Sequence, residues 1–193
     1  MKTLLRISDA LERFVVGVGR LAAWSFVLLV VVIMFDVITR RFFAMGSVKL
    51  QEMEWYLHAL LFLMCLGLGY VHNTHVRIEI LSERFSERTR CWIEVAGCVL
   101  FLIPFCLLVI YYGGELTQRS WAKGEVSASA TGLPYRWLIK AAVPAGMTVL
   151  LLAGVSVLMR RMVMLARPDL VPPPPPPQHE TAVMSPRSPV GSE

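Results

Sequence analysis

Four long apolar runs, separated by short charged segments, dominate the pattern of hydrophobic and polar positions along the chain. They cover residues 21–39, 55–71, 95–112 and 141–159. A helix rises about 1.5 Å per residue, so runs of this length reach about 26–29 Å, close to the about 30 Å of a bilayer's hydrocarbon core. The pattern therefore predicts an all-α integral membrane protein with four transmembrane helices.

A shorter amphipathic pattern precedes the first apolar run. Between residues 4 and 18, apolar side chains recur every three or four positions, with charged side chains between them. This spacing predicts a separate amphipathic helix over residues 1–20 that lies at the cytoplasmic membrane interface. Two roles fit such a helix: an arm that docks on a partner subunit, or an anchor at the membrane surface.

The C-terminal end of the chain has a different character. Six consecutive prolines, from Pro172 to Pro177, are followed by a polar stretch that ends at Glu193. Proline tracts adopt the extended polyproline II conformation and serve as spacers or as docking sites for proline-reading modules. Residues 166–193 are therefore expected to form a disordered cytoplasmic tail, and the membrane domain is expected over residues 21–165.

Composition agrees with a membrane protein, and the basic residues set its orientation. Hydrophobic residues make up 55% of the 193 residues, too large a share for a soluble domain of this size. Of the 19 Lys and Arg, twelve lie in the N-terminal segment, the loop between the second and third runs, and the tail; seven lie in the other two loops. Because basic loop residues stay in the cytoplasm, both termini are expected there. The net charge of +5 then indicates this topology and contact with anionic membrane lipid rather than with nucleic acid.

Few ionisable residues lie within the apolar runs, where charge is costly. Asp36 precedes Arg40 by four residues, so the two side chains are expected to pair on one helix face near the non-cytoplasmic interface. A proton or ion relay would need a second acidic group at similar depth, and the only one nearby, Glu94, lies at the opposite membrane face. A haem with two axial His needs facing helices, whereas His58 is the only His within the runs.

No constellation of residues indicates catalysis. Ser, His and acidic residues do not cluster, and no glycine-rich phosphate loop follows a strand pattern. Glu52 and Glu54 could act as an acid–base pair, but two carboxylates at the start of a span are more often solvated or in contact with a neighbour. No catalytic, cofactor-binding or metal-binding residue is expected, and the chain is not expected to be an enzyme.

Several stretches, in order along the spans, resemble a known family. The sequence DVITR (residues 36–40) ends the first span, and the acidic segment LQEMEWYL (residues 50–57) opens the second. The second span ends in GLGY (residues 67–70), followed by HVRIEIL (residues 75–81). Over residues 10 to 165 the chain resembles the small membrane subunit, DctQ-like, of tripartite ATP-independent periplasmic (TRAP) transporters.

A later stretch is similar to one subgroup of that family. Ser120-Trp121, Glu125, Ser127 and GLPYRW (residues 132–137) resemble the subgroup often labelled for mannitol, chloroaromatic compounds or 2-oxo acids. The resemblance implies a sodium-coupled secondary transporter of the bacterial inner membrane that imports organic anions. Its implied partners are a large permease subunit, which carries the substrate and sodium sites, and a periplasmic binding protein. The small subunit is implied to be a scaffold that steadies the static part of the large one.

The resemblance also implies which residues contact the large subunit. The candidates are charged residues at the ends of the first two spans and in the segment after the second. They are Asp36, Arg40, Glu52, Glu54, His75, Arg77 and Glu79. The loop 113–136 would face the periplasm and the binding protein. The alternative interpretation is a free-standing four-helix membrane scaffold, or a redox anchor subunit, with no transport partner.

Overall fold

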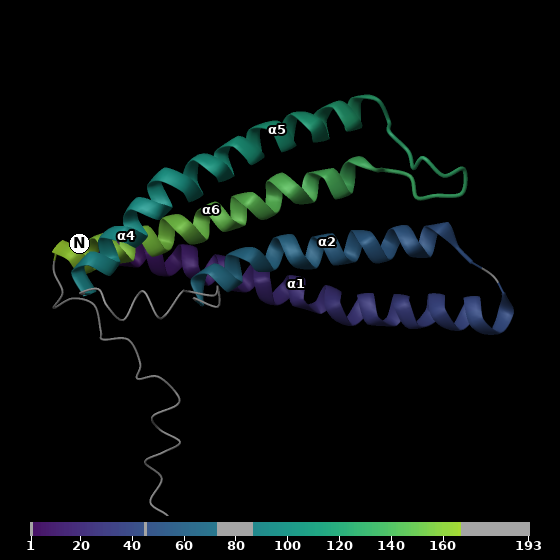
Figure 1. Cartoon of the computed structure of the whole chain (residues 1–193), viewed down its shortest axis with the longest axis horizontal. Helices are drawn as coiled ribbons and strands as arrows, with labels where there is room; N and C mark the ends of the chain where they lie inside the picture. The colour runs from purple at the N-terminus through teal and green to yellow at the C-terminus, as the bar shows by residue number, and fades with distance from the viewer. Residues whose placement is uncertain (1, 45, 73–86, 167–193) are drawn as a thin grey trace, which may run out of the picture.

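The computed structural model describes residues 2–44, 46–72 and 87–166, most of which lie in helices (Figure 1). In chain order these are α1 (Lys2–Phe43), α2 (Val48–Val71), α4 (Glu87–Gly97), the π-helical turn η1 (Cys98–Leu102), α5 (Ile103–Ala122) and α6 (Trp137–Ala166). Because α4, η1 and α5 follow one another directly, the elements make four long helical segments. All four are long and apolar enough to cross a membrane, which confirms the expected fold class.

Helix α1 departs from its expected division into two parts. It is one unbroken helix of 42 residues, about 63 Å long at 1.5 Å per residue. A boundary between an interfacial helix and the first span was expected at residue 20, but the helix continues through that position. No proline interrupts it, and Gly19 fits closely against Leu68 of α2. Its first half also packs along α6 through Ser8 and Val15, both of which are fully buried.

Helix α6 is the centre of the fold. It packs against α1, α2 and α5, and α1 also packs against α2. Figure 1 shows the resulting order, in which α5, α6, α2 and α1 follow one another across the view. Large apolar side chains remain exposed on the outer helices, such as Phe35 of α1 and Phe105 of α5. Such wide apolar surfaces are typical of contact with lipid or with another membrane protein.

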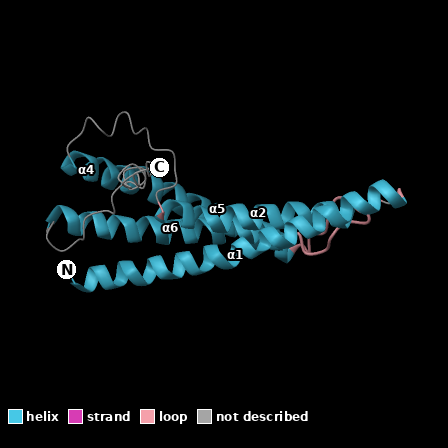
Figure 2. Ribbon diagram, turned by 90° about the horizontal axis from the view of Figure 1, so that it is seen from below, coloured by secondary structure: helices cyan, strands magenta, loops and turns pink. Residues whose placement is uncertain are grey.

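The two chain ends of the bundle lie together. Figure 1 shows the N-terminus of α1 beside the C-terminal end of α6, and the view in Figure 2 agrees that α1 and α6 run along one another. We call this the terminal end. The opposite end, with the α1–α2 connection (residues 44–47) and the α5–α6 loop (residues 123–136), we call the loop end.

Two glycines, which have no side chain, allow α2 and α6 to pack closely. A Cβ atom added at Gly67 of α2 would lie 2.8 Å from Val149 Cγ1 of α6. One added at Gly146 of α6 would lie 2.8 Å from the backbone oxygen of Leu63 in α2. Membrane helices come this close where small residues let the backbones approach. The two glycines therefore fix how near α2 can lie to the central helix.

The π-helical turn η1 fits the third span to α6. Pro104, at the start of α5, has no N–H to donate to the carbonyl of Leu100, and η1 includes that position. The turn places Leu102 against Gly154 of α6, where an added Cβ would lie 2.2 Å from Leu102 Cδ2. In the same turn, Cys98 Sγ donates to the Gly154 carbonyl at 3.5 Å. The wide turn of η1 therefore packs against the backbone of Gly154, which has no side chain.

Candidate functional site

At the loop end, Glu52 of α2 holds the α5–α6 loop against the bundle. Its carboxylate accepts a hydrogen bond from the backbone N–H of Leu133 at 2.6 Å and another from the hydroxyl of Ser127. Gly132 lies beside these groups, and an added Cβ there would come within 2.8 Å of Glu52 Oε2. Hydrogen bonds to an ionised acceptor are stronger than neutral ones. Glu52 therefore anchors the loop.

A second carboxylate closes the same loop onto α5 and α6. Glu125 accepts a hydrogen bond from Ser120 Oγ at 2.7 Å and forms an ion pair with Lys140 of α6. The hydrogen bonds from Lys140 and Ser120 hold the pKa of the Glu125 carboxyl below its usual value. The backbone N–H of Arg136 also donates to the Glu125 carbonyl at 3.1 Å. Both sides of the loop are thus tied to helices.

Aromatic residues flank the anchored loop. The rings of Trp121 and Trp137 meet edge to face, with centroids 4.3 Å apart, and join the ends of α5 and α6. Tyr135 has a φ of +65° and an exposed side chain. A bulky residue in this left-handed region is strained, and the surrounding structure must hold it there. The anchored loop therefore presents Tyr135 at the loop end in a fixed conformation.

The expected pairing of Asp36 with Arg40 is present on α1. One carboxylate oxygen of Asp36 binds the guanidinium of Arg40, which confirms the predicted pair on one helix face. Asp36 is only 3% exposed, and its Oδ1 has no hydrogen-bond partner among the described residues. Among the residues that the structure describes, no three His, Cys, Asp or Glu side chains come together as a metal site requires. The pair serves to neutralise a buried carboxylate.

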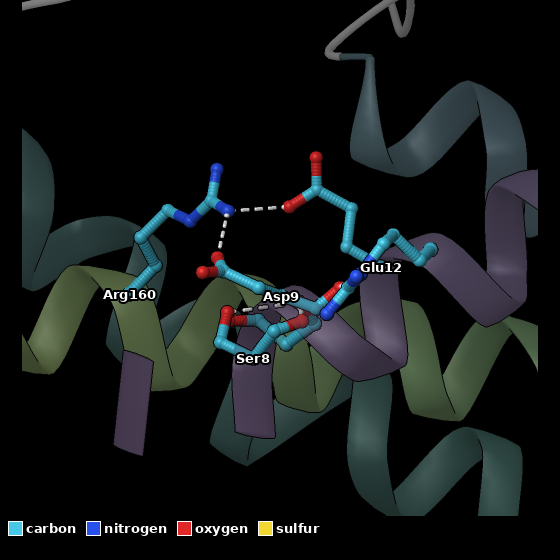
Figure 3. Close-up of polar contacts among 6 residues, drawn as sticks. Ser8, Asp9, Glu12 and Arg160 are labelled. Atoms are coloured by element: carbon cyan, nitrogen blue, oxygen red, sulfur yellow. Dashed lines mark hydrogen bonds and ion pairs between the residues drawn. The ribbon is translucent and has the colours of Figure 1, made fainter. Parts of the chain in front are cut away.

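At the terminal end, two consecutive arginines of α6 reach the helices on either side. Arg160 pairs with Asp9 at 2.9 Å and with Glu12 at 2.6 Å, both on α1 (Figure 3). Arg161 pairs through Nε with Glu94 of α4. Successive residues of a helix point about 100° apart, so neighbouring arginines serve two different helices. We call these contacts the arginine clamp.

Beside the clamp lies a buried pair of serines. Ser8 Oγ of α1 donates to the Ser156 carbonyl of α6 at 3.0 Å, and Ser156 Oγ donates to the Ser8 carbonyl at 3.0 Å. The two residues are 0% and 2% exposed. Small hydroxyl residues allow close helix approach and supply bonds between helices in an apolar setting. The serine pair and the clamp together fix α1 against α6.

Four of the seven predicted contact residues lie apart from these clusters or outside the described residues. Glu54 of α2 is half-buried and has no hydrogen bond or ion pair with any residue that the structure describes, in contrast to Glu52. His58, one turn further along α2, is exposed and is likewise without a partner there. The predicted contact residues of the segment after α2, His75 to Glu79, lie outside the described residues.

Most of the polar contacts could not be predicted from the sequence. The carboxylate of Glu52 and the N–H of Leu133 are 81 positions apart, and the serine pair is 148 positions apart, so no local spacing reveals either contact. The sequence contains one indication of the serine pair, because Ser156 interrupts the apolar run 141–159. A small hydroxyl residue in such a run indicates a bond to a neighbouring helix.

A comparison with protein families identifies the chain. The model described as "Tripartite ATP-independent periplasmic transporters, DctQ component" matches residues 29–164, more than half of the chain. The chain belongs to the DctQ family. No curated protein matches it. DctQ proteins are the small membrane component of TRAP transporters, so the chain is a multi-pass membrane protein of a transporter family rather than of an enzyme family.

The family match covers only part of the contacts described above. Residues 29–164 include Glu52, Glu125 and both arginines of the clamp. The first part of α1 precedes the match, and with it Ser8, Asp9 and Glu12. In this DctQ chain, the two carboxylates that hold the loop therefore lie within the matched region. The residues of α1 that contact α6 at the terminal end lie before it.

Proposed function

We propose that this DctQ chain is the scaffold subunit of a sodium-coupled TRAP transporter that imports organic anions across the bacterial inner membrane. Its partners are a large permease subunit, which carries the substrate and sodium sites, and a periplasmic binding protein. The match to the DctQ family over residues 29–164 supports the assignment. The GLPYRW stretch and its neighbours favour the subgroup labelled for mannitol, chloroaromatic compounds or 2-oxo acids.

One structural observation carries the scaffold role. The polar clusters at both ends of the bundle join helices or hold a loop, through Glu52, Glu125 and the arginine clamp. The outer helices instead present apolar side chains to their surroundings. A protein built in this way binds to other membrane components by its surface, while its own polar groups keep its shape.

The orientation follows from the basic residues. The terminal end is cytoplasmic, because the N-terminal segment and the tail belong to the more basic set of segments. The loop end is then periplasmic, and the anchored loop with exposed Tyr135 and Trp121 faces the binding protein. Anionic lipid lies against the basic cytoplasmic side.

The predicted contact residues divide into two groups. Asp36 and Glu52 are bonded within the chain, so they support the interface with the large subunit indirectly, by holding α1 and the loop in place. Arg40 is about half exposed and keeps donors for a partner. Glu54, with His75, Arg77 and Glu79 of the segment after α2, is proposed to contact the large subunit directly.

Affinity purification from native membranes in mild detergent, followed by mass spectrometry of the co-purifying proteins, tests the proposal. We expect a large polytopic membrane protein to be recovered with the chain. Recovery of the chain alone, under conditions that keep other membrane complexes intact, would contradict it and favour a free-standing scaffold. A Soret band in the absorption spectrum would instead indicate a redox anchor subunit.

A further inference from the structure

The outward face of α2 carries a hollow between two large aromatic side chains. Trp55, His58, Ala59 and Phe62 line an open hollow of about 430 Å³. Trp55 and Phe62 are 71% and 62% exposed, and His58 lies between them and is exposed as well. The small side chain of Ala59 leaves the space open. This face lies opposite Gly67, which is buried against α6.

His58 is unlike every other exposed residue of the expected spans. Residues 21–39, 55–71, 95–112 and 141–159 are all described, and His58 is the only exposed Asp, Glu, His, Lys or Arg among them. On α5, the exposed positions of the span are apolar or tyrosine, such as Phe105 and Leu108. Apolar surfaces of this kind are compatible with lipid chains, which offer no hydrogen-bond partner to an imidazole.

The surroundings of His58 exclude a partner within the described chain. His58 has no hydrogen bond or ion pair there, and its neighbours in the hollow, Trp55, Ala59 and Phe62, offer it no acceptor from their side chains. A polar group left unpaired in an apolar setting is costly, and ionisable residues within spans almost always face protein or a water-filled cavity. A neighbouring protein helix that carries a polar group would satisfy His58 on this face of α2.

We propose that this face is the docking surface for a transmembrane helix of the large permease subunit. The proposal rests on the scaffold function above and deepens it by naming the surface. The docked helix places a hydrogen-bond acceptor at the depth of His58 and inserts an apolar side chain between Trp55 and Phe62. One turn nearer the loop end, Glu54 is half-buried and unpaired within the described chain, so the helix carries a basic residue at that level.

Site-specific photo-crosslinking in native membranes tests this surface. A photoreactive amino acid replaces Phe62 on α2 or, as the matched control, Phe105 on α5, which is similarly exposed at 57%. We expect a crosslink to the large subunit from position 62 and none from position 105. A crosslink from position 105 but not 62, or from neither position while the large subunit still co-purifies, would overturn the docking surface and leave the scaffold function intact. Absence of any large subunit from the preparation would overturn both.

Substitutions in the hollow provide a second readout. Ala59→Trp fills the space, and His58→Leu removes the hydrogen bond; each should lower the recovery of the large subunit, by about fivefold or more for His58→Leu. His58→Gln, which keeps a donor, should restore much of the recovery. Leu108→Trp on α5 is the control and should leave recovery unchanged. Undiminished recovery with both Ala59→Trp and His58→Leu would overturn the proposal.

Discussion

Glu52 of α2 accepts a hydrogen bond at 2.6 Å from the backbone N–H of Leu133, which lies 81 positions later in the chain. With the bond from Ser127, this contact makes the α5–α6 loop part of the helical bundle rather than a free connection. The anchored loop is the largest non-helical segment among the described residues. The attachment of the loop to α2 therefore depends on the carboxylate of Glu52, while Glu125 ties the loop to α5 and α6.

Replacing Glu52 by Ala should release the loop. Hydrogen bonds to a charged group are stronger than neutral ones, and the substitution removes two of them. We expect faster cleavage within residues 123–136 in limited proteolysis of the detergent-solubilised protein. Glu54→Ala is the matched control, because Glu54 has no partner among the described residues. Equal cleavage rates for the two variants would show that Glu52 does not hold the loop.

Acid should weaken the contacts of Glu125 that hold the same loop to α5 and α6. The pKa of Glu125 is lowered by its bonds to Lys140 and Ser120. A carboxyl whose pKa is lower in the folded protein contributes stability that is complete above its usual pKa and is lost as the pH falls through the folded value. We expect proteolysis of residues 123–136 to accelerate as the pH falls from about 6 to about 3, with an acid-stable protease. Glu125→Gln should be cleaved rapidly already at neutral pH and should show a smaller change with pH; an unaltered pH profile would contradict the role of Glu125.

Gly67 should tolerate no side chain. An added Cβ would lie 2.8 Å from Val149 Cγ1 and 3.1 Å from the Val149 backbone oxygen, so Gly67→Ala forces α2 and α6 apart. Overpacking of this kind costs about 1–3 kcal/mol. We expect Gly67→Ala to lower the midpoint of thermal unfolding in detergent, measured by tryptophan fluorescence. Gly97→Ala, where no atom lies within 4 Å of the added Cβ, is the control; a similar loss in both variants would point to glycine's backbone rather than to the contact.

The serine pair should contribute to the docking of α1. Ser156→Ala removes a buried hydrogen bond to the Ser8 carbonyl, with an expected loss of about 1 kcal/mol. Thr148→Ala is the comparison, because its hydroxyl bonds only within α6, to the Pro144 carbonyl. The free energy of unfolding in detergent and denaturant should fall for the first variant and change little for the second. No difference between them would mean that the pair adds nothing to stability.

The sequence predicted the elements of the fold better than their contacts. The apolar runs located all four spans because hydropathy acts along the chain, and the spacing of Asp36 and Arg40 predicted their pairing because it lies within one helix. The unbroken course of α1 was not predicted, since a polar, amphipathic segment that packs on α6 has the same pattern as one at a membrane surface. Glu52 was predicted to contact another subunit; its bonds to Leu133 and Ser127 required knowledge of which loop lies beside α2.

Native mass spectrometry of the complex, released from detergent micelles, would show whether the chain is bound to a large permease subunit. We expect a species whose mass equals the 21.7 kDa chain plus one large polytopic subunit. That species should dissociate on activation into the two components. A spectrum that contains the chain only by itself or bound to copies of itself, from membranes where the large subunit is intact, would contradict the assignment as a TRAP scaffold subunit.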